Sequence, residues 1–456
     1  MSQSESRKQR VLALRDLYLD LARSSQAEQD NVTIRELRQL IEFASASSLW
    51  WNNYFLHADR GTDSLSVLLE SLPIMTRSFV QDNLAAMQLQ VPGASQNDYI
   101  VHKTSGSTGQ PVQVRKHATS YFMEYDAITL LDWAWHKRDI AKVVGGFRID
   151  AEEQQDAVTS APLSYLGKAP NQFSLSALAR SPKELVAGLA KHKAAYVYSN
   201  GVTIRLAALE QLENPQAGLK LEQFLSVSDP VSPGLRELVR DAFGAKICNR
   251  YSSEEFGYIA LQCPVHDHMH VIAPSVHVEV VDEHGRACSE GEVGRVLVTA
   301  LHSFAMPLVR YAIGDFAMWG SPCDAGITWP VIENVMGRER NTIVGSDGQS
   351  RIVSLIGMSI LSNKKLRDYQ VVVLSESILF VANVREPFDS FEISDLESEL
   401  QNIFRRKVPV HVLLTDHIKW RSAVKRSEFD VLNVRFDEIQ NLTHLEKLLS
   451  SSDLIP

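Results

Sequence analysis

A short stretch rich in hydroxyl groups and glycines carries the clearest chemical signal in the chain. Thr104–Pro111 holds four hydroxyl side chains and two glycines in its first six positions. Glycines let a loop adopt positive φ, so that successive backbone N–H groups form a nest for an anion, and hydroxyls add donors to phosphate oxygens. A solvent-exposed Ser/Gly turn is the alternative. No Gly-Lys-Ser/Thr follows at the spacing of a Walker-type P-loop, so any cation that acts on a bound phosphate is expected from elsewhere.

Two adjacent carboxylates follow a predicted strand. Glu254 and Glu255 lie in the segment Tyr251–Gly257, just after a strand that is expected to end at Cys248. Open α/β sheets bind ligands outside the carboxyl ends of their strands. Mg²⁺ near a triphosphate takes one or two carboxylates plus phosphate oxygens, so this pair is a candidate magnesium site. A solvated acidic turn is the alternative.

Three later segments complete the set of candidates. Asp315 is the last residue of the segment Arg310–Asp315, in which a tight glycine turn could present the aspartate to both ribose hydroxyls. An Asx-type turn between two strands is the alternative. Gly337–Arg340 taken alone is a solvated charged linker. Lys425 taken alone is a surface lysine.

The composition is that of an ordinary globular protein. The 456 residues are 45% hydrophobic and 22% charged, and this length predicts two or three domains. A net charge of −9 argues against a nucleic-acid partner. Four cysteines are too few for a disulfide framework and predict reduced thiols in the cytoplasm. The polar N-terminus and the lack of a long apolar run predict a soluble chain without a membrane partner.

The elements that must position these residues predict an α/β fold. Apolar spacing predicts helices over 7–23, 33–46, 64–72 and 121–135, and helix–strand pairs over 185–198 and 234–248. Helices that alternate with short strands are typical of a largely parallel sheet.

The pattern becomes rich in β-structure near residue 270. Strands are predicted at 277–281 and 293–300 around a hairpin-like turn, and at 343–344, 370–374, 378–384 and 410–414. A helix is predicted over 394–404, with Ser394 as its N-cap and Glu397 completing a capping box. We predict two domains, 1–337 and 338–456.

The order of the chemical segments resembles the adenylate-forming superfamily of acyl-CoA synthetases and adenylation domains. A glycine–hydroxyl loop is followed by Tyr-x-x-x-Glu, Tyr-x-x-Gly-Asp, Gly-Arg and a late lysine. The chain is most similar to the phenylacetate–coenzyme A ligase branch, in which phrases such as those at 71–77, 291–296 and 306–311 are typical. The resemblance implies a large N-terminal domain with mixed and parallel sheets and a small, mobile α+β C-terminal domain.

The resemblance also implies a role for each matched residue. Glu255 would hold Mg²⁺, Asp315 would bind the ribose, and Tyr251 would stack near the adenine or border the acyl pocket. Arg338 would contact the nucleotide near the interdomain hinge, and Lys425 would stabilise charge on the carboxylate and the α-phosphate. The residues implied to embrace the ATP phosphates, with Thr108 also counted as catalytic, are Thr104, Ser105, Gly106, Ser107, Thr108 and Gly109.

Four positions depart from the pattern of the superfamily. Gln110 replaces the lysine that normally ends the loop, and Glu254 stands where Ser or Thr precedes the motif glutamate. Val424 replaces the glycine before the late lysine, and Arg340 stands where an acidic hinge residue is expected. These departures bear on phosphate binding, on the assignment of the lysine and on the thioester half-reaction.

A cysteine- and histidine-rich segment suggests zinc. Cys263 and His266 form a Cys-x-x-His pair, but a closed tetrahedral site needs four ligands. Relatives carry a later Cys-x-Cys-Gly segment, of which this chain keeps Cys323 but has Ala325. We predict a structural Zn²⁺ site formed by Cys263, His266, His270 and Cys323. The alternative is a decayed site with surface histidines and buried thiols.

Three functions remain open at this stage. The first is a ligase that uses ATP to convert a carboxylic acid to an acyl-adenylate and passes the acyl group to coenzyme A. The second is an adenylating enzyme of secondary metabolism that passes it to an amine or a carrier protein, and the third is a non-catalytic nucleotide-binding descendant. Residues 133–146 and 196–202 are expected to line a pocket for an apolar or aryl acid. A homodimer is compatible with the sequence.

Overall fold

A computed structural model describes most of the chain. The described residues are 3–104, 111–148, 159–160, 171–177, 179–227, 231–338, 342–344, 350–352, 365–404, 408–416, 418, 429–432 and 434–450. The chain forms two compact units, of which the first comprises 1–141, 160–170 and 249–336, and the second 142–159, 171–248 and 337–456. The last segment of the second unit begins at Gly337, next to the predicted boundary, and the same unit also contains 142–159 and 171–248. The mobility of the C-terminal part stays a prediction.

The first unit begins with the predicted N-terminal helices. Ser25 caps α2 and forms a reciprocal capping box with Glu28, which fixes the start of that helix. The apolar residues of α2 pack into the main core of the unit together with Trp51 of α3. The helices of this region are α1 (Gln3–Leu21), α2 (Gln26–Ser47), α3 (Leu49–Tyr54), α4 (Leu65–Glu70), α5 (Arg77–Asp82) and α6 (Leu84–Met87).

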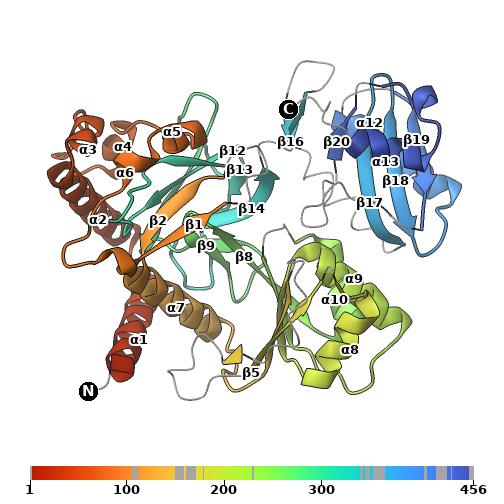
Figure 1. Cartoon of the computed structure of the whole chain (residues 1–456), viewed down its shortest axis with the longest axis horizontal. Helices are drawn as coiled ribbons and strands as arrows, with labels where there is room; N and C mark the ends of the chain where they lie inside the picture. Colours follow the sequence, from red (N-terminus) through yellow and green to blue (C-terminus); the bar gives the residue numbers. More distant parts are fainter. Residues whose placement is uncertain are drawn as a thin grey trace. The chain divides into compact units, whose positions relative to one another are not determined.

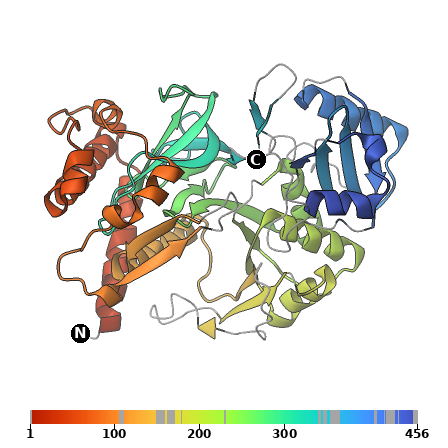
Figure 2. The same ribbon diagram turned by 45° about the horizontal axis from the view of Figure 1, so that its top comes forward.

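A hairpin and a long helix follow these helices. Strands β1 (Tyr99–Lys103) and β2 (Gln113–His117) pair antiparallel, and the glycine–hydroxyl segment connects them. The hairpin is the orange ribbon in Figures 1 and 2. Helix α7 (Ala118–Trp135) follows directly and confirms the helix predicted over 121–135.

The sheet of the first unit is mainly antiparallel. Its strand order is β11-β12-β13-β14-β10-β9-β8. The predicted hairpin is confirmed by the full register between β11 and β12, from Val276 opposite Ala300 to Val281 opposite Arg295. The strands are β8 (Lys246–Ser253), β9 (Gly257–Gln262), β10 (Met269–Val271), β11 (Val276–Val281), β12 (Val293–Ala300), β13 (Tyr311–Trp319) and β14 (Val331–Arg338).

The sheet of the second unit contains the predicted parallel strands. β3 pairs parallel with β5 and β6, and β6 pairs parallel with β7. Three helices pack their apolar faces on one side of these strands, as Figure 1 shows. The elements are β3 (Val144–Arg148), β4 (Thr159–Ser160), β5 (Asn171–Ser176), α8 (Pro182–His192), β6 (Tyr196–Ser199), α9 (Gly201–Glu213), β7 (Gln223–Ser226) and α10 (Pro233–Phe243).

The C-terminal part of the second unit is a four-stranded sheet of order β19-β18-β17-β20 with a helix on each face. Side chains that alternate along β17 pack with Leu400 of α12 on one face and with Leu445 of α13 on the other. A short antiparallel pair, β15–β16, precedes this sheet. The elements are β15 (Thr342–Val344), β16 (Ser350–Ile352), β17 (Leu366–Val373), β18 (Ile378–Val384), α12 (Ser390–Phe404), β19 (Val410–Leu414), β20 (Phe429–Val431) and α13 (Leu442–Ser450).

The predicted start of the helix at 394 is wrong. Helix α12 begins at Ser390, so Ser394 lies inside it. The capping box is formed five residues earlier, where Glu392 N donates to Asp389 Oδ1 and Asp389 N donates to Glu392 Oε2. Aspartate caps a helix as well as serine does, and the earlier box adds a helical turn.

Among the described residues, no helix is long and apolar enough to cross a membrane. All four cysteines lie in the described part of the chain, and none of them forms a disulfide.

Candidate functional site

Thr104 closes the base of the glycine–hydroxyl segment. Its backbone N–H donates to Val112 O over 3.0 Å, and its Oγ1 accepts from Val112 N over 2.9 Å. Arg77, the first residue of α5, donates a further bond to Thr104 Oγ1 over 3.1 Å. Helix α5 therefore brings a guanidinium to the start of the segment, a feature that sequence reasoning missed.

The two adjacent glutamates lie in the tight turn between β8 and β9. Strand β8 extends to Ser253, five residues beyond the end expected at Cys248, so that the turn joins an antiparallel hairpin. Glu255 is buried, with 5% of its surface exposed, and its carboxylate accepts no hydrogen bond from the described part of the chain. A buried carboxylate in this state fits a metal ligand, because an ionised group is costly to bury without a cation. The solvated acidic turn is wrong for Glu255.

Tyr251 and Asp315 lie together, as residues of one site should. Tyr251 Oη donates to Asp315 Oδ2 over 2.7 Å, and both side chains are buried. The expected tight turn at Asp315 is wrong, because Asp315 lies inside strand β13. Gly314 has φ +81° where the β12–β13 register shifts between Arg295 and Leu297, which marks a bulge that redirects the strand.

Several predicted residues lie outside the described part of the chain. For Arg338, only its position at the end of β14 is described. The roles proposed for these side chains stay predictions. The predicted residues outside the described part of the chain are Ser105, Gly106, Ser107, Thr108, Gly109 and Lys425.

A buried lysine near the glutamate turn was not predicted. Lys116 of β2 is 6% exposed, and its Nζ donates to Glu254 O over 2.9 Å. Its ammonium lies 4.0 Å from the centre of the Tyr121 ring. Burial lowers the pKa of Lys116 to about 8, although the charges of Glu254 and Glu255 oppose this shift. The alternation along β2, with Val114 and Lys116 both facing inward, was the signal in the sequence.

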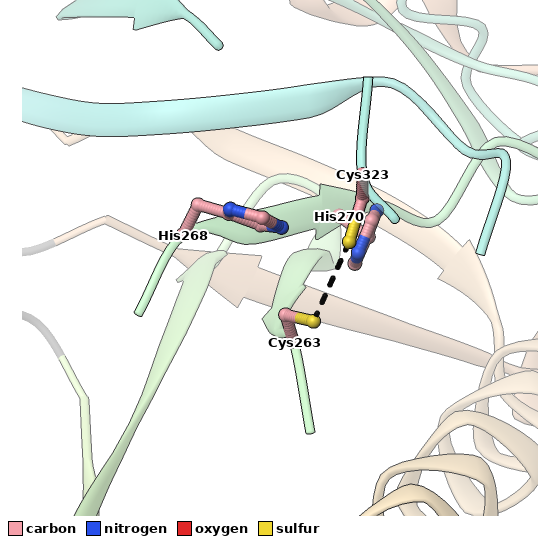
Figure 3. Close-up of side chains that lie close together, drawn as sticks. All are labelled: Cys263, His268, His270 and Cys323. Carbon is pink, nitrogen blue, oxygen red and sulfur yellow. Dashed lines mark hydrogen bonds between the residues drawn. The ribbon is translucent and has the colours of Figure 1, made fainter. Parts of the chain in front are cut away.

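A second cluster lies at the other end of β9 and is formed by sulfur and nitrogen donors. Cys263, His268, His270 and Cys323 place one donor atom each within 4.8 Å of one another. The two Sγ atoms are 3.8 Å apart, and Figure 3 shows them facing each other beside the two histidine rings. Two thiolates on a tetrahedral zinc with Zn–S bonds near 2.3 Å would be about 3.8 Å apart.

The environment of the cluster fits neutral imidazole ligands. His270 Nδ1 donates to Trp329 O over 3.1 Å, so that its Nε2 carries the lone pair. The Nε2 atoms of His268 and His270 are buried and have no hydrogen-bond partner in the described part of the chain. Burial lowers the pKa of His270 to about 4 and also lowers the pKa of His268. Backbone N–H groups two residues beyond each cysteine donate to the sulfur atoms.

Three of the four predicted zinc ligands lie in this group, and the fourth, His266, lies in a second group with Cys323 and Asp324. The structure gathers Cys263, His270 and Cys323 as predicted, but His268 takes the fourth place in this group. His266 Nε2 instead lies 2.6 Å from Asp324 Oδ1, at the exposed edge of the cluster. His268 and His270 are two residues apart and lie beside or in β10, whereas His266 lies in the turn before that strand. Side chains two apart on a strand share a face, and this pattern could have identified His268.

Comparison with known proteins yields one relative by sequence. The chain is 27% identical over 179 residues to a phenylacetate-coenzyme A ligase of Thermus thermophilus. This match spans 37% of the chain and only 40% of the relative's length. No protein-family model matches the chain.

Solved structures match almost the whole fold. A 2-hydroxyisobutyryl-CoA ligase in the postadenylation state, in complex with R3-HIB-AMP, aligns with a TM-score of 0.72 at 16% identity over 94% of each chain. An anthranilate CoA ligase in complex with anthranoyl-AMP aligns with a TM-score of 0.54 at 13% identity, over 80% of this chain and 73% of that one. The predicted α/β fold, that of acyl-CoA ligases of the adenylate-forming type, is confirmed, and so is the resemblance to the phenylacetate–coenzyme A ligase branch.

Proposed function

We propose that this chain is an ATP-dependent ligase. It would convert a carboxylic acid to an acyl-adenylate and then transfer the acyl group to the thiol of coenzyme A. The observation that carries the proposal is the β8–β9 hairpin, which places Tyr251 on Asp315 and buries Glu255 at its turn. These are the positions at which the resemblance puts the nucleotide and magnesium ligands. The structural neighbours are CoA ligases with bound acyl-AMP, and their activities support the same reaction.

The chemistry of the first step is mainly electrostatic. A carboxylate oxygen of the acid attacks the α-phosphorus of ATP, the bond to the bridging oxygen breaks, and pyrophosphate leaves with that electron pair. Two anions must approach each other, so positive charge and hydrogen-bond donors lower the barrier. Glu255 would hold Mg²⁺, which supplies positive charge at the phosphates, and Asp315 would fix the ribose. We assign Lys425 to the charge on the attacking carboxylate and the α-phosphate.

The second step distinguishes the favoured function from its alternatives. In a CoA ligase the thiolate sulfur attacks the acyl carbon, and AMP leaves. An adenylating enzyme that uses an amine or a carrier protein would share the first step only, and a non-catalytic descendant would bind ATP without releasing pyrophosphate. We favour coenzyme A because both solved neighbours described above are CoA ligases. An apolar or aryl acid, a cytoplasmic location and a homodimer stay predictions.

Pyrophosphate release provides the test. It would be measured with ATP and Mg²⁺ over a panel of aryl, acyl and amino acids, with and without coenzyme A. We expect release that depends on one class of acid, turns over only with coenzyme A, and is lost in Glu255→Gln and Lys425→Ala. Glu283→Gln, at an exposed hairpin turn, is the matched control. Tight ATP binding without release across the panel would contradict the proposal.

We also propose that the cluster formed by Cys263, His268, His270 and Cys323 holds a structural Zn²⁺ ion. Two thiolates and two neutral imidazoles form a common zinc ligand set, and four protein ligands leave no open position for catalysis. The buried, unpartnered Nε2 atoms support the proposal, since such atoms are rare without a ligand. The proposed ligation reaction does not involve this ion.

Metal content distinguishes this ligand set from the one predicted by sequence. Elemental analysis of protein purified without added metal should give about one zinc per chain. His268→Ala should lose the metal, and the exposed His284→Ala should keep it. Retention of zinc in His268→Ala together with its loss in His266→Ala would restore the sequence-based set. A metal-free wild-type protein that also fails to take up added Zn²⁺ would contradict the site.

A further inference from the structure

The glutamate turn is held by side chains from the hairpin that carries the glycine–hydroxyl segment. Lys116 of β2 bonds to the backbone of Glu254, and His102 of β1 bonds to the side chain of the same residue. All of these groups belong to the first unit. The neighbour of Glu254 in the turn is Glu255, the residue to which we assign Mg²⁺.

The position of Lys116 is costly unless its contacts serve a purpose. A buried ammonium loses its hydration and needs compensating partners. Lys116 has a carbonyl oxygen at 2.9 Å and the face of Tyr121 at 4.0 Å, which together satisfy it. Both partners fix its direction toward the turn, so the side chain is locked between β2 and the glutamates.

The second contact explains a departure from the superfamily pattern. Glu254 stands where Ser or Thr is expected, and its Oε2 accepts from His102 Nδ1 over 3.0 Å. The His102 ring packs edge-on against Tyr121 at 4.9 Å. Gly257 has φ +75°, and a Cβ there would lie 3.4 Å from the Tyr121 ring. The turn is therefore fixed to the hairpin at its backbone, by Lys116, and at its side chain, by His102.

We propose that Lys116 and His102 are positioning residues that fix the turn carrying Glu255, the residue to which we assign Mg²⁺, an inference that rests on the proposed function. They do not touch the reacting atoms, and they act through Glu254. Lys116 also places a positive charge on the strand that follows a loop with Gln110 in place of lysine. The clamp thus connects two parts of the site that are about 150 residues apart in sequence.

A magnesium titration tests the clamp. With saturating ATP and acid, Lys116→Met should raise the Mg²⁺ concentration for half-maximal pyrophosphate release about tenfold, because the turn that carries the metal ligand is held less firmly. The KM for the acid should stay unchanged. Lys116→Arg should recover part of the affinity, because it keeps the charge. Lys246→Met, at the exposed start of β8, is the matched control. A folded Lys116→Met protein with wild-type Mg²⁺ dependence would overturn the proposal.

Two further readouts keep the test decisive. If Lys116→Met does not fold, the more exposed pair of His102 and Glu254 replaces it. His102→Ala and Glu254→Gln should each raise the Mg²⁺ concentration for half-maximal release about threefold, and the double variant should raise it no more than either single variant. Hydrogen exchange of the peptide over 252–258 should rise in the variants relative to wild type. If wild type releases no pyrophosphate, the proposed function fails, and unchanged exchange in the variants would separately reject the clamp.

Discussion

Strand β9 has a charged site at its start and a site of neutral donors at its end. Before Gly257, the turn carries two glutamates that face a lysine and a histidine. After Gln262, the chain enters the cluster that begins with Cys263. Both sites are built on one six-residue strand, yet the first is suited to a hard cation and the second to zinc.

The difference shows how one hairpin framework supports two kinds of chemistry. At the charged end, the carboxylate of Glu255 has no described protein donor, so a ligand can compete for it. At the neutral end, the donor atoms converge on one another, and a carbonyl oxygen fixes the His270 tautomer. We infer that the first end binds a metal ion that can exchange with solvent, whereas the second end holds its metal ion permanently.

The largest expected effect comes from a buried charged group that joins α7 to β8 and β9 and so supports both ends of β9. Asp132 is buried and bonded to Arg138 at 2.6 Å and to Arg250 of β8, which also lies over Tyr258 of β9. Asp132→Asn should lower the free energy of unfolding by about 3–5 kcal/mol, because it removes the carboxylate charge that two buried guanidinium groups share. Asp82→Asn, at an exposed position, is the control. Denaturant unfolding measures the change, and a loss below about 1 kcal/mol would show that the ends do not depend on this centre.

The same group gives a pH dependence. Burial raises the pKa of Asp132, but the charges of Arg250 and Arg138 outweigh it and lower the pKa to about 2. The folded-state pKa is below the ordinary value of 3.8, so the stabilisation is fully present above about pH 4 and is lost as the pH falls toward 2. Between pH 5 and 2, the free energy of unfolding should therefore fall more steeply with decreasing pH for wild type than for Asp132→Asn. Parallel curves would contradict the shift.

The next effect should be confined to the charged end. Glu255→Gln should reduce kcat for pyrophosphate release about 100- to 1000-fold, because an amide holds Mg²⁺ poorly. Zinc content and the thermal midpoint should stay at wild-type values. A variant that lost zinc as well would break the separation between the two ends.

The sequence predicted the fold class, because the alternation of helices and strands follows from local patterns, whereas the roles of the site residues stay predictions. The hairpin over 276–300 follows from alternation and turn residues. The resemblance placed Tyr251 and Asp315 in one site, and the structure joins their side chains by a hydrogen bond. The bulge at Gly314 and the true start of α12 were missed, since capping and register depend on neighbours that spacing alone does not define.

Residues that act through tertiary contacts were harder to predict. Lys116 and His102 precede Glu254 by more than 130 positions, so only the fold brings them together. His268 was within reach, because a strand through residue 270 places it on the same face. His266 was instead predicted from the Cys-x-x-His spacing that begins at Cys263, and this spacing does not show where the next strand begins.

Removal of the metal should affect the neutral end alone and to a smaller extent. Chelation, or His268→Ala, should lower the free energy of unfolding by about 3 kcal/mol, the value expected when a ligand present at 100 times its Kd is withdrawn. The Mg²⁺ dependence of pyrophosphate release by the remaining folded protein should not change. A chelator that abolished release at temperatures where the protein stays folded would mean that the cluster serves the reaction, contrary to the structural assignment.

The smallest effect should come from the hydrogen bond between Tyr251 and Asp315. Tyr251→Phe removes one bond to a carboxylate at 2.7 Å and keeps the ring, so stability should fall by about 1 kcal/mol. If Asp315 binds the ribose, the freed carboxylate loses its orientation, and the KM for ATP should rise about fivefold with kcat little changed. Tyr54→Phe, on α3, whose hydroxyl donates to Pro73 O over 3.4 Å, is the control for the loss of a hydroxyl. An unchanged KM for ATP together with a raised KM for the acid would place Tyr251 at the acyl pocket, the other role that its position in the superfamily pattern allows.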